Sequence, residues 1–299
     1  MRAYLRRHPT IAFFALVFGV SWTMSVVQLL VPPSTGGAPS PAQIAGTVIS
    51  ALALRIELLS PALAGVVMSW AVRGRSGLRD LAARCTLWRV GWRWYAIVLV
   101  AFPLVFGSAI VLAVAITGAG NPVAAPVGWQ MWVLMPLLVA LGGPLHEELG
   151  WRGFALPRLM DRFGDLSASV ILGVLWAAWH WQPWELPQMF ARYSAAEVFL
   201  PNQLAAVALA VVMTWVYRNT GGSVLVAGFG MHLAANLVLA VVSTSIEVIT
   251  PAAVTWGQTA GLAACAVAIV VRYGPGRFSR QQVPAPRAGA PEAHAGRYN

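Results

Sequence analysis

We predict that this chain is an all-α, polytopic membrane protein with about eight transmembrane helices. Of its 299 residues, 58% are hydrophobic and only 10% are charged, whereas a soluble domain carries about 25% charged residues. The apolar residues form eight runs near the length of about 20 residues that crosses the hydrocarbon of a bilayer. Arginines gather in every second connection between these runs.

The eight candidate spans are, in order, 10–31, 44–72, 94–117, 129–150, 166–182, 202–217, 222–244 and 252–271. The second is the least regular, because Arg55 and Glu57 interrupt it and Pro61 follows. Its membrane part is therefore expected to begin near Leu58. The first span has the basic start of a signal peptide, but it is longer than such a segment and lacks a small-residue cleavage pattern, so we expect it to be retained.

The arginine distribution predicts the orientation. The segments before the first span and after the second, fourth, sixth and last are basic, whereas 32–43 and 118–128 carry no charge. By the positive-inside rule both termini are expected in the cytoplasm, and a bacterial-type inner (cell) membrane is the expected location. Arginines interleave with Leu and Trp over 73–93, which predicts a basic helix lying on the inner leaflet.

The composition predicts one membrane domain, residues 1–272, followed by a disordered cytoplasmic tail, residues 273–299. The tail is rich in Gly, Pro, Arg, Ala and Gln and cannot build a core. The net charge of +10 is spread over membrane-flanking loops, which indicates anionic lipid headgroups rather than nucleic acid as the partner. Cys85 and Cys265 lie in different segments, so neither a disulfide framework nor a thiolate metal site is indicated.

Ionisable side chains interrupt the fourth span, in the stretch Pro-Leu-His-Glu-Glu-Leu-Gly-Trp-Arg-Gly. Each ionisable group inside a bilayer costs about 2.5 to 3.5 kcal/mol on insertion scales, so such groups indicate function. Arg152 follows Glu148 by four residues, and the two can pair on one helical face. Glu147 points about 100° away around the helix and is left for another role.

Two further helical pairs lie in other spans. Trp176 precedes His180 in the fifth, and His232 precedes Asn236 in the seventh, each by four residues. A glutamate, a histidine and amide donors are the groups that activate water and stabilise an oxyanion. Taken singly, each has a structural explanation: the histidines and the asparagine can join helices, and the tryptophan can pack. Their occurrence together favours chemistry.

A zinc site is the alternative. His146 and Glu147 begin like a zincin helix, but the second histidine position is Gly150, so the His-Glu-x-x-His motif is absent. Glu147, His180 and His232 could still supply a carboxylate and two imidazoles to zinc. We expect that no cofactor is required, with zinc as the open alternative.

The three elements together resemble the CPBP family of intramembrane proteases, which includes CAAX prenyl endopeptidases and bacteriocin-processing or abortive-infection proteins. The resemblance covers 129–245 and rests on Glu-Glu-x-x-x-Arg, aromatic-x-x-x-His and His-x-x-x-Asn in that order. Trp176 stands where phenylalanine is common in the family, and His146 precedes the glutamates. The resemblance implies catalytic Glu147, His180, His232 and Asn236, supported by Glu148, Arg152 and Trp176.

In the roles that the resemblance implies, Glu147, helped by His180, activates a water for attack on a peptide carbonyl. His232 and Asn236 hold the oxyanion, and the remaining fourth-span charges shape the cavity. The implied function is an intramembrane endopeptidase acting on membrane-associated, prenylated or leader peptides. Two other classes stay open: a catalytically idle bacteriocin-immunity or scaffold protein of the same fold, and a proton-coupled transporter. The substrate and the oligomeric state are not readable from the residues.

One geometric condition follows. If the fourth helix ended at Gly150, Glu147 would lie near the cytoplasmic surface and His180 about 22 Å deeper, too far apart to cooperate. We therefore expect that the fourth helix continues to Leu159, with Arg152 inside the protein. The fifth helix is expected to be tilted or to start below the surface.

Overall fold

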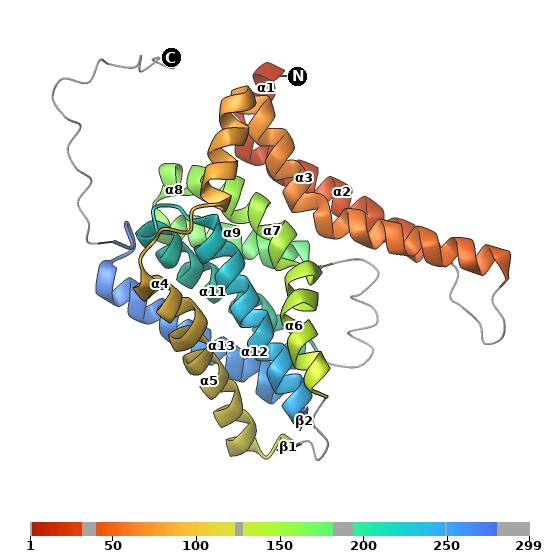
Figure 1. The fold of residues 1–299 in the computed structure, drawn as a ribbon, viewed down its shortest axis with the longest axis vertical. Helices are drawn as coiled ribbons and strands as arrows, with labels where there is room; N and C mark the ends of the chain where they lie inside the picture. The colour runs from red at the N-terminus through yellow and green to blue at the C-terminus, as the bar shows by residue number, and fades with distance from the viewer. Residues whose placement is uncertain (1, 32–39, 123–127, 182–193, 249, 280–299) are drawn as a thin grey trace.

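The computed structural model describes residues 2–31, 40–122, 128–181, 194–248 and 250–279. Six helical stretches in this part of the chain are long and apolar enough to cross a membrane: Pro9–Leu29, Pro41–Cys85, Trp92–Thr117, Ala195–Asn219, Leu225–Ser245 and Pro251–Tyr273. The other two predicted spans are also helical but shorter. The predicted all-α, multi-pass membrane fold is confirmed (Figure 1).

The helices follow one another as α1 (Arg2–Arg7), α2 (Pro9–Leu29), α3 (Pro41–Cys85), α4 (Trp92–Ala96), η1 (Ile97–Ala101), α5 (Phe102–Thr117), α6 (Trp129–Gly142), α7 (Pro144–Gly150), η2 (Trp151–Ala155), α8 (Leu156–Phe163), α9 (Asp165–Trp179), η3 (Ala195–Phe199), α11 (Leu200–Asn219), η4 (Leu225–Gly230), α12 (Met231–Ser245) and α13 (Pro251–Tyr273). Each η segment is a short π-helical stretch that continues directly into the α-helix after it. Strands β1 (Gly120–Pro122) and β2 (Ile246–Val248) form a small antiparallel ribbon.

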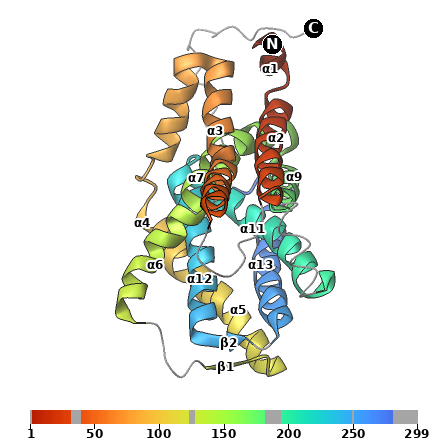
Figure 2. The same ribbon diagram turned by 90° about the vertical axis from the view of Figure 1, so that its right-hand side faces the viewer.

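Helices α2 and α3 pack along each other as a long hairpin (Figures 1 and 2). Helix α3 starts at Pro41 and stays helical through Arg55 and Glu57, the residues that interrupt the apolar run. The reason is that Glu57 is fully buried and accepts a 2.8 Å hydrogen bond from Gln28 of α2. The helix bends instead at Gly74, whose φ of +62° is a left-handed value that glycine adopts without strain.

The fourth and fifth predicted spans differ from simple crossings. Helix α6 has 14 residues, or about 21 Å, against about 30 Å of hydrocarbon. Its continuation breaks at Gly143, and a new helical arm, α7–η2–α8, runs without interruption to Phe163. The fourth helix thus continues past Leu159, as expected. The described part of the fifth span is α9, which begins directly after this arm; residue 182 lies outside the described residues.

Four described connections between helices lie in two pairs, one pair at each end of the bundle. At one end β1 pairs with β2, which joins the two connections after α5 and α12. At the other end Arg84 bonds the hydroxyl of Tyr217 at 3.2 Å, and Ser223 bonds the carbonyl of Leu87 at 2.6 Å. The basic connections after α3 and α11 therefore lie together.

Part of the predicted tail, 273–299, contacts the core. Residues 274–279 pack against the core, where Phe278 is fully buried and its N–H donates to Asp165 at 2.8 Å. Asn219 donates to the Phe278 carbonyl at 2.6 Å. The buried Asp165 also pairs with Arg218, and a buried carboxylate needs such donors. The rest of the predicted tail, 280–299, lies outside the described residues.

Candidate active site

The glutamates stand at the start of a new helix rather than at the end of an old one. Pro144 occupies the first turn of α7, where its missing N–H costs no hydrogen bond. The Gly143 carbonyl accepts the N–H groups of His146 and Glu147. A Cβ at Gly143 would lie 2.5 Å from Oε1 of Glu147, so the glycine leaves room for this carboxylate. The Gly-Gly-Pro sequence at 142–144 indicates this break, which the prediction of one span over 129–150 did not include.

Glu147 is held by the fifth span. Its side chain is 4% exposed, and its Oε2 accepts a 2.7 Å hydrogen bond from the indole Nε1 of Trp176 in α9. In the described part of the chain its Oε1 has no hydrogen-bond donor and faces the space beside Gly143. One carboxylate oxygen is thus positioned by Trp176, and the other lies beside Gly143.

Glu148 is the centre of a second set of contacts. Its Oε1 accepts a hydrogen bond from Arg152 at 2.8 Å, which is the predicted ion pair, and it lies 2.9 Å from Nδ1 of His232 in α12. Glu148 is 1% exposed and Arg152 is fully buried. Gly228 of η4 lies close enough that a Cβ there would stand 3.1 Å from the Glu148 side chain. Three helical segments therefore meet around this buried charge pair.

Trp176 connects the two sets. The guanidinium carbon of Arg152 lies 4.5 Å from the centroid of the Trp176 ring, and the His232 ring packs edge-on against it at 5.1 Å. The His180 ring packs against the same tryptophan at 5.9 Å. The expected contact between Trp176 and His180 is present, and the hydrogen bond to Glu147 adds a contact that helical spacing alone could not indicate.

His180 is exposed at the end of α9. Its Nδ1 lies 2.9 Å from the Trp176 carbonyl, and a carbonyl only accepts, so Nδ1 carries the proton. In the neutral ring Nε2 is then the acceptor, which suits proton transfer with water. The structure thus brings Glu147, Glu148 and both histidines around Trp176, with His180 at the rim.

His232 and Asn236, the two residues predicted to hold the oxyanion, have different surroundings. His232 turns its Nδ1 to Glu148, so Nε2 is the nitrogen left for another group. Asn236 is half-buried one turn further along α12 and makes no side-chain hydrogen bond within the described ranges. The two share a helical face, but they do not bond each other.

The zinc alternative stays an open prediction. In the described part of the chain, no three His, Cys, Asp or Glu side chains gather in a way that could hold a metal ion. Oε2 of Glu147 accepts from Trp176 and Nδ1 of His232 faces Glu148, which leaves Oε1 of Glu147 and Nε2 of His232 as the atoms that a metal ion would use.

Helical geometry explains why Glu147 and His180 come together. The arm α7–η2–α8 and helix α9 meet at Gly164, whose φ of +77° allows the chain to reverse. Glu147 lies 17 residues before this glycine and His180 lies 16 residues after it. Two helical arms of nearly equal length place their ends at the same level, which satisfies the geometric condition set by the sequence.

The fold and this site define a class: a multi-pass membrane protein whose bundle encloses paired carboxylates, an arginine and a histidine, with a second histidine at the rim. Residues 128–238 match the family described as type II CAAX prenyl endopeptidase Rce1-like. This segment contains every residue of the site, and the match agrees with the resemblance to CPBP proteases.

A curated relative supports the same assignment. The chain is 31% identical over 105 residues to CAAX prenyl protease 2 of Methanococcus maripaludis. The aligned region is 32% of this chain and 35% of the relative. The chain thus spans about a third of the length of the curated relative that it matches.

Proposed function

We propose that the protein is an intramembrane endopeptidase that hydrolyses a peptide bond with a water activated by Glu147 and His180. The observation that carries the proposal is the placement of Glu147, with Oε2 held by Trp176 and Oε1 left beside Gly143. A carboxylate fixed at one oxygen can take a water proton at the other, and an oriented general base contributes about 10² to 10⁴ in rate.

His180 assists as the second proton carrier. Its Nδ1 is occupied by the Trp176 carbonyl, so the exposed Nε2 can accept a proton from the water or return one to the leaving amine. On the other side of Trp176, Nε2 of His232 and the amide of Asn236 are the donors proposed for the oxyanion. A ring protonated at both nitrogens donates to Glu148 and to the oxyanion together.

The Glu148–Arg152 pair holds this arrangement. Arg152 joins Glu148 on its own helical arm, and Glu148 joins His232 on α12. The contacts of Glu148 therefore connect the helical arm of the glutamates to α12. Removing one partner would leave an uncompensated buried charge. We propose no metal in this chemistry.

The substrate is proposed to be a membrane-associated peptide. The name of the curated relative, CAAX prenyl protease 2, makes prenylated C-terminal peptides the first substrates to test, and leader peptides are the second. We propose that both termini are cytoplasmic and that the protein resides in the cell membrane, since the basic connections gather at one end of the bundle.

The test uses the full chain purified and reconstituted in liposomes. Prenylated and unprenylated CAAX-type peptides and a leader peptide are incubated with the normal protein and with Glu147→Ala, and products are identified by mass spectrometry. Cleavage by the normal protein alone is expected. Comparing membrane proteomes of cells that carry either form extends the search to natural substrates. A Glu147→Ala protein that cleaves as fast as the normal one contradicts the mechanism.

A further inference from the structure

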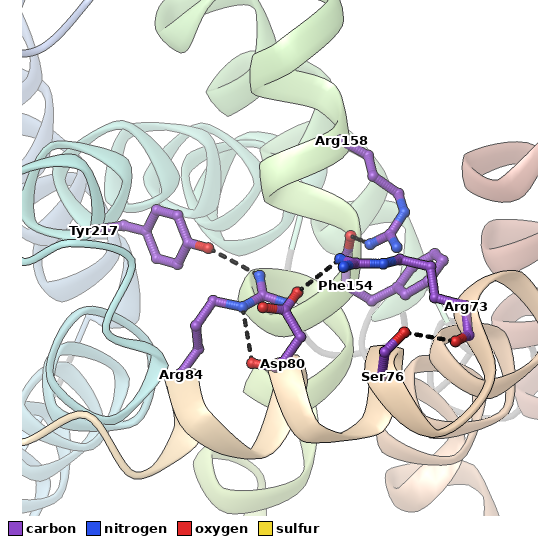
Figure 3. Close-up of polar contacts among 7 residues, drawn as sticks. All are labelled: Arg73, Ser76, Asp80, Arg84, Phe154, Arg158 and Tyr217. Atoms are coloured by element: carbon purple, nitrogen blue, oxygen red, sulfur yellow. Dashed lines mark hydrogen bonds and ion pairs between the residues drawn. The ribbon is translucent and has the colours of Figure 1, made fainter. Parts of the chain in front are cut away.

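Three arginines converge at the basic end of the bundle, outside the site described above. Figure 3 shows Arg73 and Arg84 reaching Asp80 from α3, while Arg158 comes from α8 toward the same point. Arg73 pairs with Asp80 at 3.2 Å, and Arg84 pairs with it at 3.5 Å. Arg84 also donates to Tyr217 at 3.2 Å. One carboxylate is therefore shared between two guanidinium groups.

Arg158 has no carboxylate partner within the described ranges. Its Nη1 donates to the Phe154 carbonyl at 2.7 Å, and its guanidinium carbon lies 3.7 Å from the centroid of the Phe154 ring. The side chain is half-buried. An arginine in this position keeps a positive charge that neither a carbonyl dipole nor an aromatic face neutralises.

The electrostatics of Arg158 agree with this geometry. Burial, followed by the charges of Arg84 and Arg73, lowers the pKa of Arg158 to about 10, and Asp161 and Asp80 offset this only in part. Like charges held together disfavour the charged form, and an added anion relieves that repulsion. The cluster thus has the charge and the free donors to bind an anion.

The surroundings of the cluster are those of a membrane interface. Trp88, in the connection after α3, and Trp92, the first residue of α4, are 59% and 75% exposed. Exposed tryptophans are typical of the headgroup level of a bilayer. Guanidinium groups match phosphate oxygens with paired hydrogen bonds, which makes arginine the preferred residue for phosphate.

We propose that Arg73, Arg84 and Arg158 form a binding site for a phosphate group, supplied by the headgroup of an anionic phospholipid. The site is distinct from the glutamates, because Arg158 lies ten residues beyond Glu148, or about 15 Å along the same helical arm. A lipid bound there contacts both α3 and α8, and it stabilises the arm that carries the catalytic carboxylates.

The experiment uses the full chain in a neutral detergent and titrates phosphatidylglycerol, phosphatidylcholine or inorganic phosphate. Thermal unfolding and native mass spectrometry report binding. Phosphatidylglycerol is expected to raise the Tm of the normal protein saturably, whereas phosphatidylcholine is not. An equal Tm shift with inorganic phosphate alone assigns the site to soluble phosphate and still supports a phosphate site.

The variants separate this site from general surface charge. Arg158→Gln is expected to weaken phosphatidylglycerol binding by roughly tenfold or more, the effect of losing a charge-assisted hydrogen bond. Arg162→Gln makes the same charge change at an exposed position of the same helix and is expected to bind as the normal protein does. Arg73→Gln gives a second variant, which is expected to fold normally because that side chain is 55% exposed. Equal losses in Arg158→Gln and Arg162→Gln, or no loss in Arg158→Gln and Arg73→Gln, would overturn the proposal.

Discussion

The indole Nε1 of Trp176 donates a 2.7 Å hydrogen bond to Oε2 of Glu147, across 29 residues of sequence. The same ring lies against Arg152 and His232. A tryptophan that was expected to pack or to orient His180 therefore also fixes the carboxylate. Because Trp176 holds Oε2 of Glu147, the carboxylate keeps one orientation, in which Oε1 lies beside Gly143.

Glu147→Ala and His180→Ala are each expected to lower proteolysis by about 10² to 10⁴, the contribution of a positioned base or proton carrier. The protein should remain folded, because neither side chain belongs to the Glu148–Arg152 pair. Turnover in liposomes, with elution profile and Tm as measures of folding, tests this. Glu247→Ala, which removes an exposed carboxylate in β2, serves as the control with unchanged turnover. Full activity in either site variant would remove the assignment.

Gly143→Ala is expected to lower turnover by at least tenfold with little change in Tm, because its Cβ would stand 2.5 Å from Oε1 of Glu147 and would displace the carboxylate. Gly142→Ala is the matched control, since a Cβ there meets nothing within 4 Å. Measuring kcat and Tm for both variants tests whether the space beside Gly143 is needed for catalysis. Equal activities would show that the space beside Gly143 does not matter for catalysis.

His232→Ala and Asn236→Ala test the oxyanion site. If each side chain donates to the oxyanion, losing one should lower kcat by about 10² to 10³ with a smaller change in KM. His232→Ala should also lower the Tm, since Glu148 then loses a partner. Asn236→Ala should leave the Tm nearly unchanged, because Asn236 makes no side-chain hydrogen bond in the described residues. An effect of Asn236→Ala on KM alone would place this residue in a binding groove instead.

Arg152→Ala is expected to lower both folded yield and activity. It leaves the buried Glu148 without its arginine, and breaking a buried ion pair costs about 3 to 5 kcal/mol. The combination of Arg152→Ala with Glu148→Gln should recover part of this stability, because the unpaired carboxylate is then gone. Thermal unfolding in detergent of the three variants measures the difference. A double variant no more stable than Arg152→Ala would show that the pair is energetically uncoupled.

Removal of metal ions is expected to leave turnover unchanged, since we propose that water is activated by Glu147 and His180 without a metal. Elemental analysis of the purified protein is paired with activity after strong chelation. Stoichiometric zinc, whose removal abolishes activity and whose return restores it, would replace the proposed mechanism with one based on zinc.

The sequence by itself determined the helical membrane fold, the eight apolar segments and the pairing of Glu148 with Arg152. These features depend on composition and on the helical period, which are properties of single segments. The positions of arginine also predict that the basic connections after α3 and α11 lie at the same end of the bundle. The Gly-Gly-Pro sequence at 142–144 likewise indicates the break between α6 and α7.

Only the tertiary structure decided which side chains from different helices meet. It turned Trp176 to Glu147 and His232 to Glu148 rather than to Asn236. It also docked Phe278 on the core through the buried Asp165. Such contacts depend on the rotation, bend and level of one helix against another, and these are set by packing across the whole bundle. Spacing within a segment places a residue on a helical face, but it does not say what lies opposite that face.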